Sequence, residues 1–490
     1  VCPVSLPSEW DEGLGARKAI YRSFPQAVPI TFCIDKKYRA PCVVTCPAGI
    51  NVQGYVQLIG QGKYRQAIEL IMQRLPLPGV LGRVCPHPCE TQCARADVDT
   101  AVAIRDLKRF AADQVDPETL PIPPIEDRSE KVAVVGSGPA GLTVAYYLRL
   151  KGYRVTIFEA LQELGGMLRV GIPDYRLPTR VLDREIGYIL HLGVDVRTRM
   201  RLGSDFTLDD LKSQGYAAVF LGMGAHSSVK LNIAGEADSH GVIDAVEFLR
   251  QVNLGAKSLP GRQVVIVGGG NVAVDAARVA VRLGAQTVRV VYRRSEQEMP
   301  AYPEEIRDAR EEAIEFSFLT APVRIIAENG NVCGLECLRT ELGEPDAGGR
   351  RRPVMVEGSE FVLACDAVIT AIGQRIDRSW AAQLPELQWS RRTTLSVDSA
   401  TLQTAIPYVF AGGDMVSGPA SVIEAVAAGH KAVAAICSFL NHEDLNIISE
   451  HAASQQSPGR DWREIPPDIA GPSRQPSRYL ESGDRTASFE

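Results

Sequence analysis

The sequence predicts an α/β protein in which two Rossmann-like nucleotide-binding domains follow a small helical domain. Two glycine-rich turns, at 136–141 and 268–273, predict the α/β part. Each turn lies between an apolar strand and a helix, as in a Rossmann-like unit. A third observation predicts the helical domain. Most of the cysteines fall within the first 93 residues, around segments whose apolar residues recur at helical spacing.

Bulk composition places the chain among ordinary globular proteins. Its 490 residues are 45% hydrophobic and 23% charged, which is enough for several domains with substantial cores. The net charge of −6 gives no reason to expect a nucleic acid or an anionic membrane as partner. No uninterrupted apolar run reaches the length of about eighteen residues that a membrane span needs, and no signal peptide is recognised. We therefore expect a cytoplasmic protein.

Two cysteine motifs, "CVVTCPAGIN" at 42–51 and "VCPHPCETQC" at 84–93, indicate a metal site. Disulfide scaffolds are normally short, secreted domains, so they are disfavoured here. Zinc sites favour two-residue spacers and closed sets of four ligands, whereas these spacers hold three residues and include prolines. The motifs favour an iron–sulfur cluster, with zinc or free thiols as alternatives. The candidate ligands are Cys33, Cys42, Cys46, Cys85, Cys89 and Cys93.

Helical spacing between and after these motifs predicts a small domain that brings the cysteines together. The segment 51–82 and the later "AVAIRDLKRFAADQV" both have this spacing. The proline-rich stretch "DPETLPIPPIEDRSE" then marks a domain boundary. The predicted helical iron–sulfur domain covers residues 1–125.

The first nucleotide-binding unit is "KVAVVGSGPAGLTVAYYLRLKGYRVTIFEA". Its glycines have G-x-G-x-x-G spacing, which allows a tight turn and brings a pyrophosphate to a helix N-terminus. Glu159 ends the second strand and is suited to bind the ribose hydroxyls. The predicted ligands in the turn are Gly136, Gly138, Pro139, Ala140 and Gly141.

The second unit, "RQVVIVGGGNVAVDAARVAVRLGAQTVRVVYRR", repeats the strand–turn–helix–strand plan. Its second strand ends in Arg293 and Arg294 rather than in an acid, and guanidinium groups suit a ribose 2′-phosphate. NADP(H) is therefore favoured over NAD(H), which remains an alternative, as does a solvated basic strand end. The predicted ligands in the turn are Gly268, Gly270, Asn271, Val272 and Ala273.

Two nucleotide folds in one chain indicate a flavin together with a nicotinamide cofactor. The segment "YVFAGGDMVSGPASVIEAVAAGHKAV" supports FAD, because Asp414 follows a strand and precedes a helix whose N-terminus would face the flavin. The FAD domain is therefore predicted to be discontinuous, covering 126–240 and 366–445, with the NAD(P)H domain 241–365 inserted. Residues 446–490 are expected to be an extended tail. The FAD ligands predicted in the returning part are Gly373, Gly413, Asp414, Ser421 and Val422.

The segment "GGMLRVGIPDYRLP" at 165–178 is predicted to line the flavin ring, the alternative being a structural loop. Its candidate ligands are Gly166, Met167 and Arg169. No catalytic side chain is predicted, because the flavin carries the chemistry of hydride transfer. A disulfide reductase is disfavoured because neither glycine-turn helix contains a cysteine pair. The cysteines expected in the core are Cys333, Cys337, Cys365 and Cys437.

These motifs together resemble the glutamate synthase small-subunit family. The resemblance rests on "GSGPAG", "GGMLRVGIPDYRLP", "GGGNVAVDAAR", "VYRRSEQEMPA", "AIGQ" and "FAGGDMVSGPASVIEAVAAG" and covers roughly residues 30–440. The cysteine motifs are similar to the N-terminal domain of dihydropyrimidine dehydrogenase. The resemblance implies a flavoprotein that takes hydride from NAD(P)H onto FAD and passes electrons singly through clusters to another protein.

The sequence departs from this family before Cys42. The family has a C-x-x-C pair there, whereas "FCIDKKYRAPC" offers only Cys33. Two [4Fe–4S] clusters, which we favour, would need more ligands than these cysteines supply, so a single cluster is the alternative. Glu90 and Asp35 are candidate oxygen ligands. The resemblance implies interleaved ligation, with one cluster on Cys42 and Cys93 and the other on Cys46, Cys85 and Cys89.

The electron acceptor is not named by any motif. The resemblance implies a redox partner protein, such as the glutamate synthase large subunit, a ferredoxin or a sulfite reductase, in a dimer or larger complex. The tail resembles a stretch that leads into a C-terminal ferredoxin-like domain in multidomain relatives. The first alternative function is therefore that of the iron–sulfur flavoprotein that accompanies dissimilatory sulfite reductase. In that case the chain would be a fragment that lacks the C-terminal ferredoxin-like domain. The second is a complex-assembly subunit whose flavin NAD(P)H does not reduce.

Overall fold

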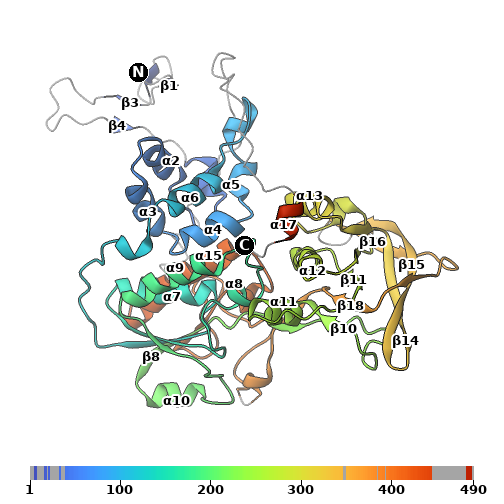
Figure 1. Cartoon of the computed structure of the whole chain (residues 1–490). Helices are drawn as coiled ribbons and strands as arrows, with labels where there is room; N and C mark the ends of the chain where they lie inside the picture. Colours follow the sequence, from blue (N-terminus) through green and yellow to red (C-terminus); the bar gives the residue numbers. More distant parts are fainter. Residues whose placement is uncertain are drawn as a thin grey trace, which may run out of the picture.

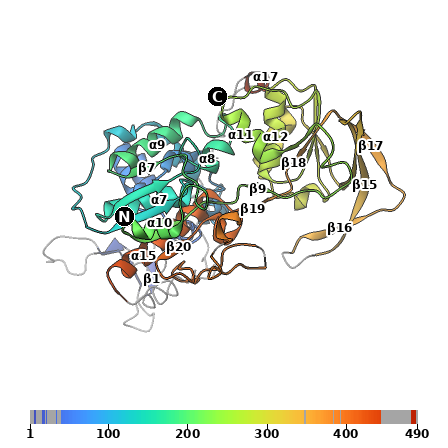
Figure 2. The same cartoon turned by 90° about the horizontal axis from the view of Figure 1, so that it is seen from below.

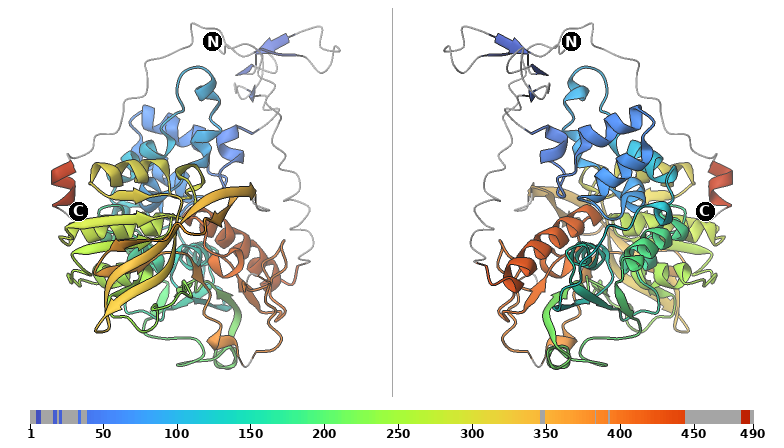
Figure 3. Two further views of the ribbon diagram at one scale, coloured as in Figure 1. Left: turned by 90° about the vertical axis from the view of Figure 1, so that its right-hand side faces the viewer. Right: turned by 90° about the vertical axis from the view of Figure 1, so that its left-hand side faces the viewer.

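The computed structural model describes residues 39–345, 349–382, 384–391, 393–443 and 482–487, with four short strand segments before residue 39. Figure 1 shows a helical region formed by α2 to α6 and two lobes, each built on its own parallel sheet. Figure 3 shows that the helical region lies over both lobes. The early strands are β1 Ser5–Pro7, β2 Ala16–Lys18, β3 Ile20–Tyr21 and β4 Cys33–Ile34.

The helical region confirms the predicted periodicity, because Tyr55 and Ile59 on α2 and Ala67 and Ile71 on α3 are buried. Proline stands in the first turn of α1, α4 and α5, where its missing N–H has no helical partner to lose. The helices are α1 Pro41–Val44, α2 Val52–Gly60, α3 Tyr64–Met72, α4 Pro78–Val84, α5 Pro88–Thr91, η1 Ala94–Asp97, α6 Ile104–Asp113 and η2 Pro117–Thr119. No helix or strand is assigned within 121–130, where the sequence predicts a linker.

The first lobe is a five-stranded parallel sheet in the order β20-β8-β5-β6-β7. Its edge strand β20 comes from the far end of the chain, which confirms that this nucleotide-binding fold is discontinuous. The strands are β5 Lys131–Val135, β6 Arg154–Phe158, β7 Asp195–Arg197, β8 Tyr216–Leu221 and β20 Val409–Ala411. The helices are α7 Pro139–Leu150, α8 Met167–Val170, α9 Thr179–His191, α10 Leu208–Ser213, η4 Ser379–Ala381, α14 Asp414–Ser417 and α15 Val422–Leu440.

The second lobe has a five-stranded parallel sheet in the order β10-β18-β11-β12-β13 and a separate four-stranded antiparallel sheet formed by β14 to β17. Its parallel strands are β10 Val242–Asp244, β11 Gln263–Val267, β12 Thr287–Val291, β13 Glu315–Ser317 and β18 Ala367–Thr370. The antiparallel strands are β14 Thr320–Glu328, β15 Asn331–Pro345, β16 Arg351–Met355 and β17 Phe361–Ala364. The helices are α11 Ala245–Asn253, α12 Asn271–Arg282, η3 Glu296–Glu298 and α13 Pro303–Glu311.

One strand lies in a different sheet from the one we assigned it to. β18 pairs with β10 and β11, although the predicted domain division placed residues 366–370 in the returning FAD part. The chain instead crosses back through β19 Gln374–Arg375, which pairs with β9 Ser227–Ser228 between the two lobes (Figure 2). All four residues of β18 are buried, and a fully apolar strand carries no signal of which sheet it joins.

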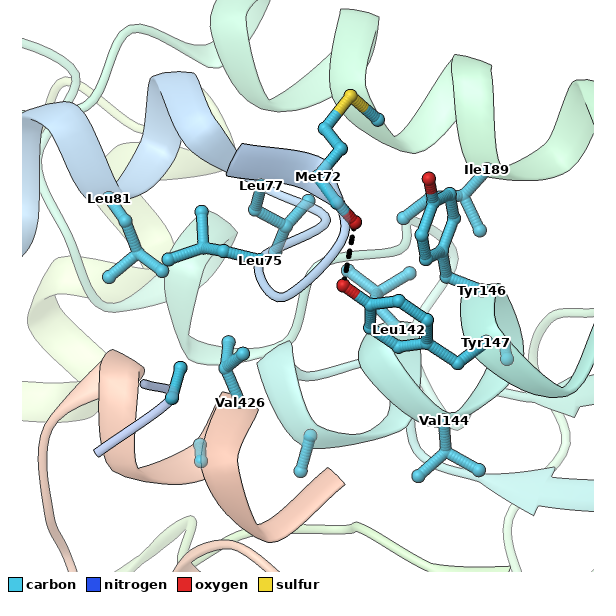
Figure 4. Close-up of a cluster of buried hydrophobic side chains, with 14 of the residues drawn as sticks. Met72, Leu75, Leu77, Leu81, Leu142, Val144, Tyr146, Tyr147, Ile189 and Val426 are labelled. Carbon is cyan, nitrogen blue, oxygen red and sulfur yellow. Dashed lines mark hydrogen bonds between the residues drawn. The ribbon is translucent and has the colours of Figure 1, made fainter. Parts of the chain in front are cut away.

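The helical region and the first lobe share one hydrophobic core, whereas the second lobe has its own. Figure 4 shows Leu75, Leu77 and Leu81 of the helical region beside Leu142 of α7 and Val426 of α15. α15 is long and apolar enough to cross a membrane by length and composition. In this fold it lies against α7 as a helix of the shared core.

A last short helix, α17 Ser482–Thr486, lies beside α12 and α13 (Figure 1). Arg485 approaches Glu311 at 2.5 Å and Asp308 at 3.8 Å.

Candidate functional site

The first glycine-rich turn is shaped by contacts that only glycine permits. Gly136 has φ 100°, and a Cβ there would lie 2.6 Å from the carbonyl oxygen of Gly222. A Cβ on Gly141 would lie 2.0 Å from the carbonyl oxygen of Gly136, so helix and strand approach too closely for any side chain. Gly138 instead opens into a cavity and precedes the first turn of α7, where unpaired N–H groups can receive a pyrophosphate.

Glu159 directly follows β6 and lines the same cavity. One carboxylate oxygen accepts hydrogen bonds from the Ser137 backbone N–H (2.9 Å) and hydroxyl (2.6 Å). The other accepts from the Leu161 N–H (2.8 Å). Sequence reasoning missed Ser137, whose hydroxyl also accepts from the Gly165 N–H (3.0 Å) and so joins turn, carboxylate and the 165–178 segment. The only available signal was a hydroxyl residue between the two glycines.

The 165–178 segment lies against the first turn, since a Cβ on Gly166 would be 3.0 Å from the Cα of Gly138. Gly166 and Met167, which were predicted to bind the flavin, line the cavity. Arg169 does not, because its guanidinium donates to the Leu164 carbonyl and pairs with Asp183 on α9. The structure therefore gives Arg169 a role within the segment and not at the cavity wall.

The returning part of the chain completes the first lobe's side of the cavity. Gly413 has φ 63° and directs the chain into α14. Burial raises the pKa of Asp414 to about 6, although its carboxylate accepts a hydrogen bond from the Ala420 N–H (3.2 Å). Ser421 and Glu424 form a capping box that starts α15 at the cavity. The predicted residues of this part that line the cavity are Gly373, Gly413, Asp414, Ser421 and Val422.

The second glycine-rich turn faces the same cavity from the other lobe. Gly270, Asn271 and Val272 line it, and the side-chain Oδ1 of Asn271 accepts a hydrogen bond from the Tyr302 backbone N–H (3.0 Å). Gly268 shapes the turn, because a Cβ there would lie 2.3 Å from the Ala371 carbonyl oxygen. Ala273, predicted as a ligand, is fully buried within α12 and does not reach the cavity.

The two arginines that end the second unit have different surroundings. Arg294 is buried, and its Nε donates to the Arg351 carbonyl (2.7 Å). Arg293 is exposed, and its carbonyl accepts a hydrogen bond from the Thr340 hydroxyl (2.8 Å). Neither residue lines the cavity itself. Arg293 is therefore the one whose guanidinium solvent can reach.

The cavity measures about 1030 Å³ and joins both glycine-rich turns. Its wall includes three residues with N–H donors in their side chains, Arg250, Gln374 and Trp380, and the N-termini of α7 and α12 add backbone N–H groups. Donors spread over a cavity of this size suit a ligand with several acceptor atoms, such as a dinucleotide. The residues present therefore fit FAD and a nicotinamide cofactor.

An ion-pair network joins the 165–178 segment to the second lobe. Arg176 contacts Asp275 on α12 (2.6 Å) and Glu305 on α13 (3.0 Å), and both carboxylates are largely buried. Arg278 approaches the same Glu305 (2.7 Å) and lies over the ring of Tyr175, 4.7 Å from its centroid. The segment thus contacts the first glycine-rich turn on one side and the helix of the second turn on the other.

The predicted cysteine ligands gather at the edge of the helical region. Burial, then the charge of Cys93, raises the pKa of Cys42. Burial, then the charge of Cys85, raises the pKa of Cys89 to about 12, and Cys46 adds to this. Cys42 and Cys93 are half-buried and the other three are buried; all five are free thiols. The interleaved ligation implied by the family resemblance stays a prediction.

Val84, the residue before Cys85, lines the cavity. The cysteine group and the nucleotide cavity are therefore adjacent along the chain at this point. Within the described residues, no three His, Cys, Asp or Glu side chains already stand in a metal-binding arrangement. Free, neighbouring thiols without a disulfide nonetheless supply the donor type that a [4Fe–4S] cluster takes.

The other candidate cluster ligands are Glu90, Cys33 and Asp35. Glu90 is buried, and its carboxylate accepts a hydrogen bond from the Arg105 N–H (2.8 Å), which caps the first turn of α6. The Arg105 side chain in turn pairs with Glu304 of the second lobe (2.6 Å). The side chain of Cys33 and all of Asp35 lie outside the described residues.

The comparisons with known proteins agree with this geometry. A model of the pyridine nucleotide-disulphide oxidoreductase family matches residues 130–429. The chain belongs to this family. Residues 30–119 match a second model, that of dihydropyrimidine dehydrogenase domain II with a 4Fe-4S cluster. The chain is thus an oxidoreductase with a nucleotide-binding region and a 4Fe–4S domain.

Three curated relatives of the chain are named as subunits or as a small chain. The NADP(+)-dependent formate dehydrogenase subunit beta of Moorella thermoacetica is 47% identical over 82% of the chain and 60% of its own length. The NADPH-Fe(3+) oxidoreductase subunit beta of Geobacter sulfurreducens is 43% identical over 82% and 64%. The glutamate synthase [NADPH] small chain of Escherichia coli is 36% identical over 81% and 88%. The chain spans less than two thirds of the first two relatives.

Solved structures support the fold. Mycobacterium tuberculosis FprA in complex with NADPH has a TM-score of 0.55 at 22% identity, over 67% of this chain and 87% of its own. Lactococcus lactis thioredoxin reductase has a TM-score of 0.50 at 21% identity, over 64% and 100%.

Proposed function

We propose that this chain is an electron-transfer subunit that binds NADPH, FAD and [4Fe–4S] clusters and exchanges electrons with a partner protein. The observation that carries this proposal is the single cavity lined by both glycine-rich turns and by Val84, next to Cys85. When bound, FAD accepts hydride from the nicotinamide and releases the electrons one at a time to iron–sulfur clusters.

The chain's own residues bind and orient these groups. The N-terminus of α7 receives the FAD pyrophosphate and Glu159 accepts from its ribose hydroxyls, while α15 and Asp414 face the flavin side. The N-terminus of α12 receives the pyrophosphate of the second nucleotide. The Arg176–Asp275 pair fixes the 165–178 segment between the two sites. NADPH is preferred in this proposal because Arg293 is available to a 2′-phosphate and three relatives carry NADP(+) or NADPH in their names.

The burial of the cysteines orders the cluster sites. Cys46, Cys85 and Cys89 are buried, and Cys85 follows Val84 of the cavity wall, so these three form the inner site. Cys42 and Cys93 are half-buried, so they form the outer site and the exit toward a partner protein. Relatives that are named as beta subunits and a small chain support a partner-protein complex.

Anaerobic titration with NADPH, and separately with NADH, tests the proposal. Visible absorbance follows the flavin, EPR follows the clusters, and iron and flavin are quantified chemically. We expect NADPH to bleach the flavin and produce a reduced-cluster signal. About eight irons per flavin would support two clusters, and about four would support one. A flavin that neither nucleotide reduces, or protein without iron, would overturn the proposal.

A further inference from the structure

The segment 72–80 includes the last residue of α3, the connection 73–77 and the first turn of α4. Two aromatic side chains of the first lobe bind the backbone of this segment. The Tyr147 hydroxyl on α7 donates to the Met72 carbonyl (2.8 Å), as Figure 4 shows. The His430 Nε2 on α15 lies 2.5 Å from the Arg74 carbonyl, and its ring is 4.3 Å from the Tyr147 ring between centroids. Burial lowers the pKa of His430 to about 4, so its neutral ring donates this hydrogen bond through Nε2–H.

A buried carboxylate binds the end of the same segment. Glu185 on α9 is 4% exposed, and its two oxygens accept from the N–H groups of Gly79 (2.5 Å) and Val80 (3.0 Å). Gly79 permits this approach, because a Cβ there would lie 3.0 Å from both the Glu185 carboxylate and the Val181 side chain. Burial raises the pKa of Glu185 to about 7, and the hydrogen bonds from Gly79 and Val80 oppose this shift by stabilising the ionised carboxylate.

These three side chains, Tyr147, Glu185 and His430, come from three helices of the first lobe and will be called the backbone clamp. The clamp acts on main-chain atoms, which transmit its position directly to α4. The far end of α4 carries Val84 at the cavity wall and is followed by Cys85. One seven-residue helix therefore separates Glu185 from the point where the cysteine group meets the nucleotide cavity.

We propose that Glu185, with the rest of the backbone clamp, is a positioning residue for electron passage between the flavin and the inner cluster. This inference rests on the proposed function. Each electron that passes oxidises the reduced flavin and reduces the cluster by one, and no bond to Glu185 forms or breaks. The clamp sets the distance between the cavity and Cys85, on which the rate of this passage depends.

Glu185→Gln tests the role, because an amide keeps the shape of the side chain but accepts only one of the two N–H groups well. The holoprotein is mixed anaerobically with NADPH in stopped flow, with flavin and cluster absorbance followed separately. We expect flavin reduction at the wild-type rate and cluster reduction slowed several-fold, because the rate of electron passage falls as the distance between the flavin site and the inner cluster site increases. Hydrogen–deuterium exchange before NADPH is added should increase within residues 72–84.

Glu126→Gln, at an exposed position in the linker, is the matched control and should change neither rate nor exchange. Tyr147→Phe removes one clamp bond while keeping the ring, and should slow cluster reduction to a smaller extent. If Glu185→Gln does not fold, Tyr147→Phe becomes the test of the inference. An unchanged rate of cluster reduction in Tyr147→Phe would then overturn it. Wild-type cluster reduction in Glu185→Gln, or loss of its iron with normal flavin reduction, also overturns it. Wild-type protein whose flavin or clusters NADPH does not reduce would instead overturn the proposed function.

Discussion

At the scale of single residues, the two arginines that end β12 show why neighbours in sequence need separate treatment. Both were predicted to bind a 2′-phosphate. Arg294 is buried and donates to a backbone carbonyl, whereas Arg293 is exposed. A buried guanidinium that already has a backbone partner would have to give it up to bind phosphate, so selectivity for NADPH should depend on Arg293.

Arg293→Gln should therefore raise the KM for NADPH roughly tenfold, because a hydrogen bond to a charged group contributes about 1.5–3 kcal/mol. The KM for NADH should stay within about twofold, since NADH has no 2′-phosphate. Steady-state reduction of an artificial acceptor by each nucleotide measures both values. Arg294→Gln is the comparison and should lower thermal stability without separating the two nucleotides. Equal changes for NADH and NADPH in Arg293→Gln would contradict the assignment.

At the scale of elements, the buried network between the 165–178 segment, α12 and α13 holds the two nucleotide sites together. Asp275→Asn should lower the free energy of unfolding by about 3 kcal/mol, because it leaves Arg176 buried with one charged partner fewer. NADPH-driven flavin reduction should slow as the segment loses its contact with α12. Denaturant titration and stopped flow measure the two effects.

The matched control is the surface pair between Arg289 and Glu315, whose side chains are 37% and 56% exposed. Glu315→Gln should change the free energy of unfolding by less than about 1 kcal/mol and leave flavin reduction unchanged. An Asp275→Asn protein as stable as this control would show that the network is not what holds the segment in place.

Elements differ in how well sequence predicts them. The glycine-rich units were predictable because a tight turn beside a helix N-terminus requires glycine at fixed spacing. The sheet of β18 was not predictable, since an entirely apolar strand fits the centre of either sheet. The role of Glu185 could not be predicted for a different reason. Helical periodicity alone predicts that a glutamate in an amphipathic helix faces solvent. Only the tertiary structure shows that the backbone N–H groups of Gly79 and Val80 lie opposite this carboxylate.

At the scale of the whole molecule, the hydrophobic cores do not follow the domains that the sequence motifs predict. The motifs separate a cysteine domain from a flavin domain, but both contribute to a single core in which Leu75, Leu77 and Leu81 contact the first lobe (Figure 4). The second lobe has its own core, and β9 and β19 connect it to the first. We therefore expect the described residues to unfold as two cooperative units, with the cysteine region and the first lobe together in one of them.

This arrangement predicts how the protein responds to loss of iron. Calorimetry should resolve two transitions, of which NADP⁺ raises the one that belongs to the second lobe. Anaerobic removal of iron with a chelator should lower the other transition by roughly 5 °C or more, because cluster binding stabilises the folded cysteine region and that region shares its core with the flavin lobe. The NADP⁺-sensitive transition should stay within about 1 °C. Iron removal that shifts both transitions equally would show one cooperative unit, and a third transition that alone responds to iron would show that the cysteine region unfolds independently of the flavin lobe.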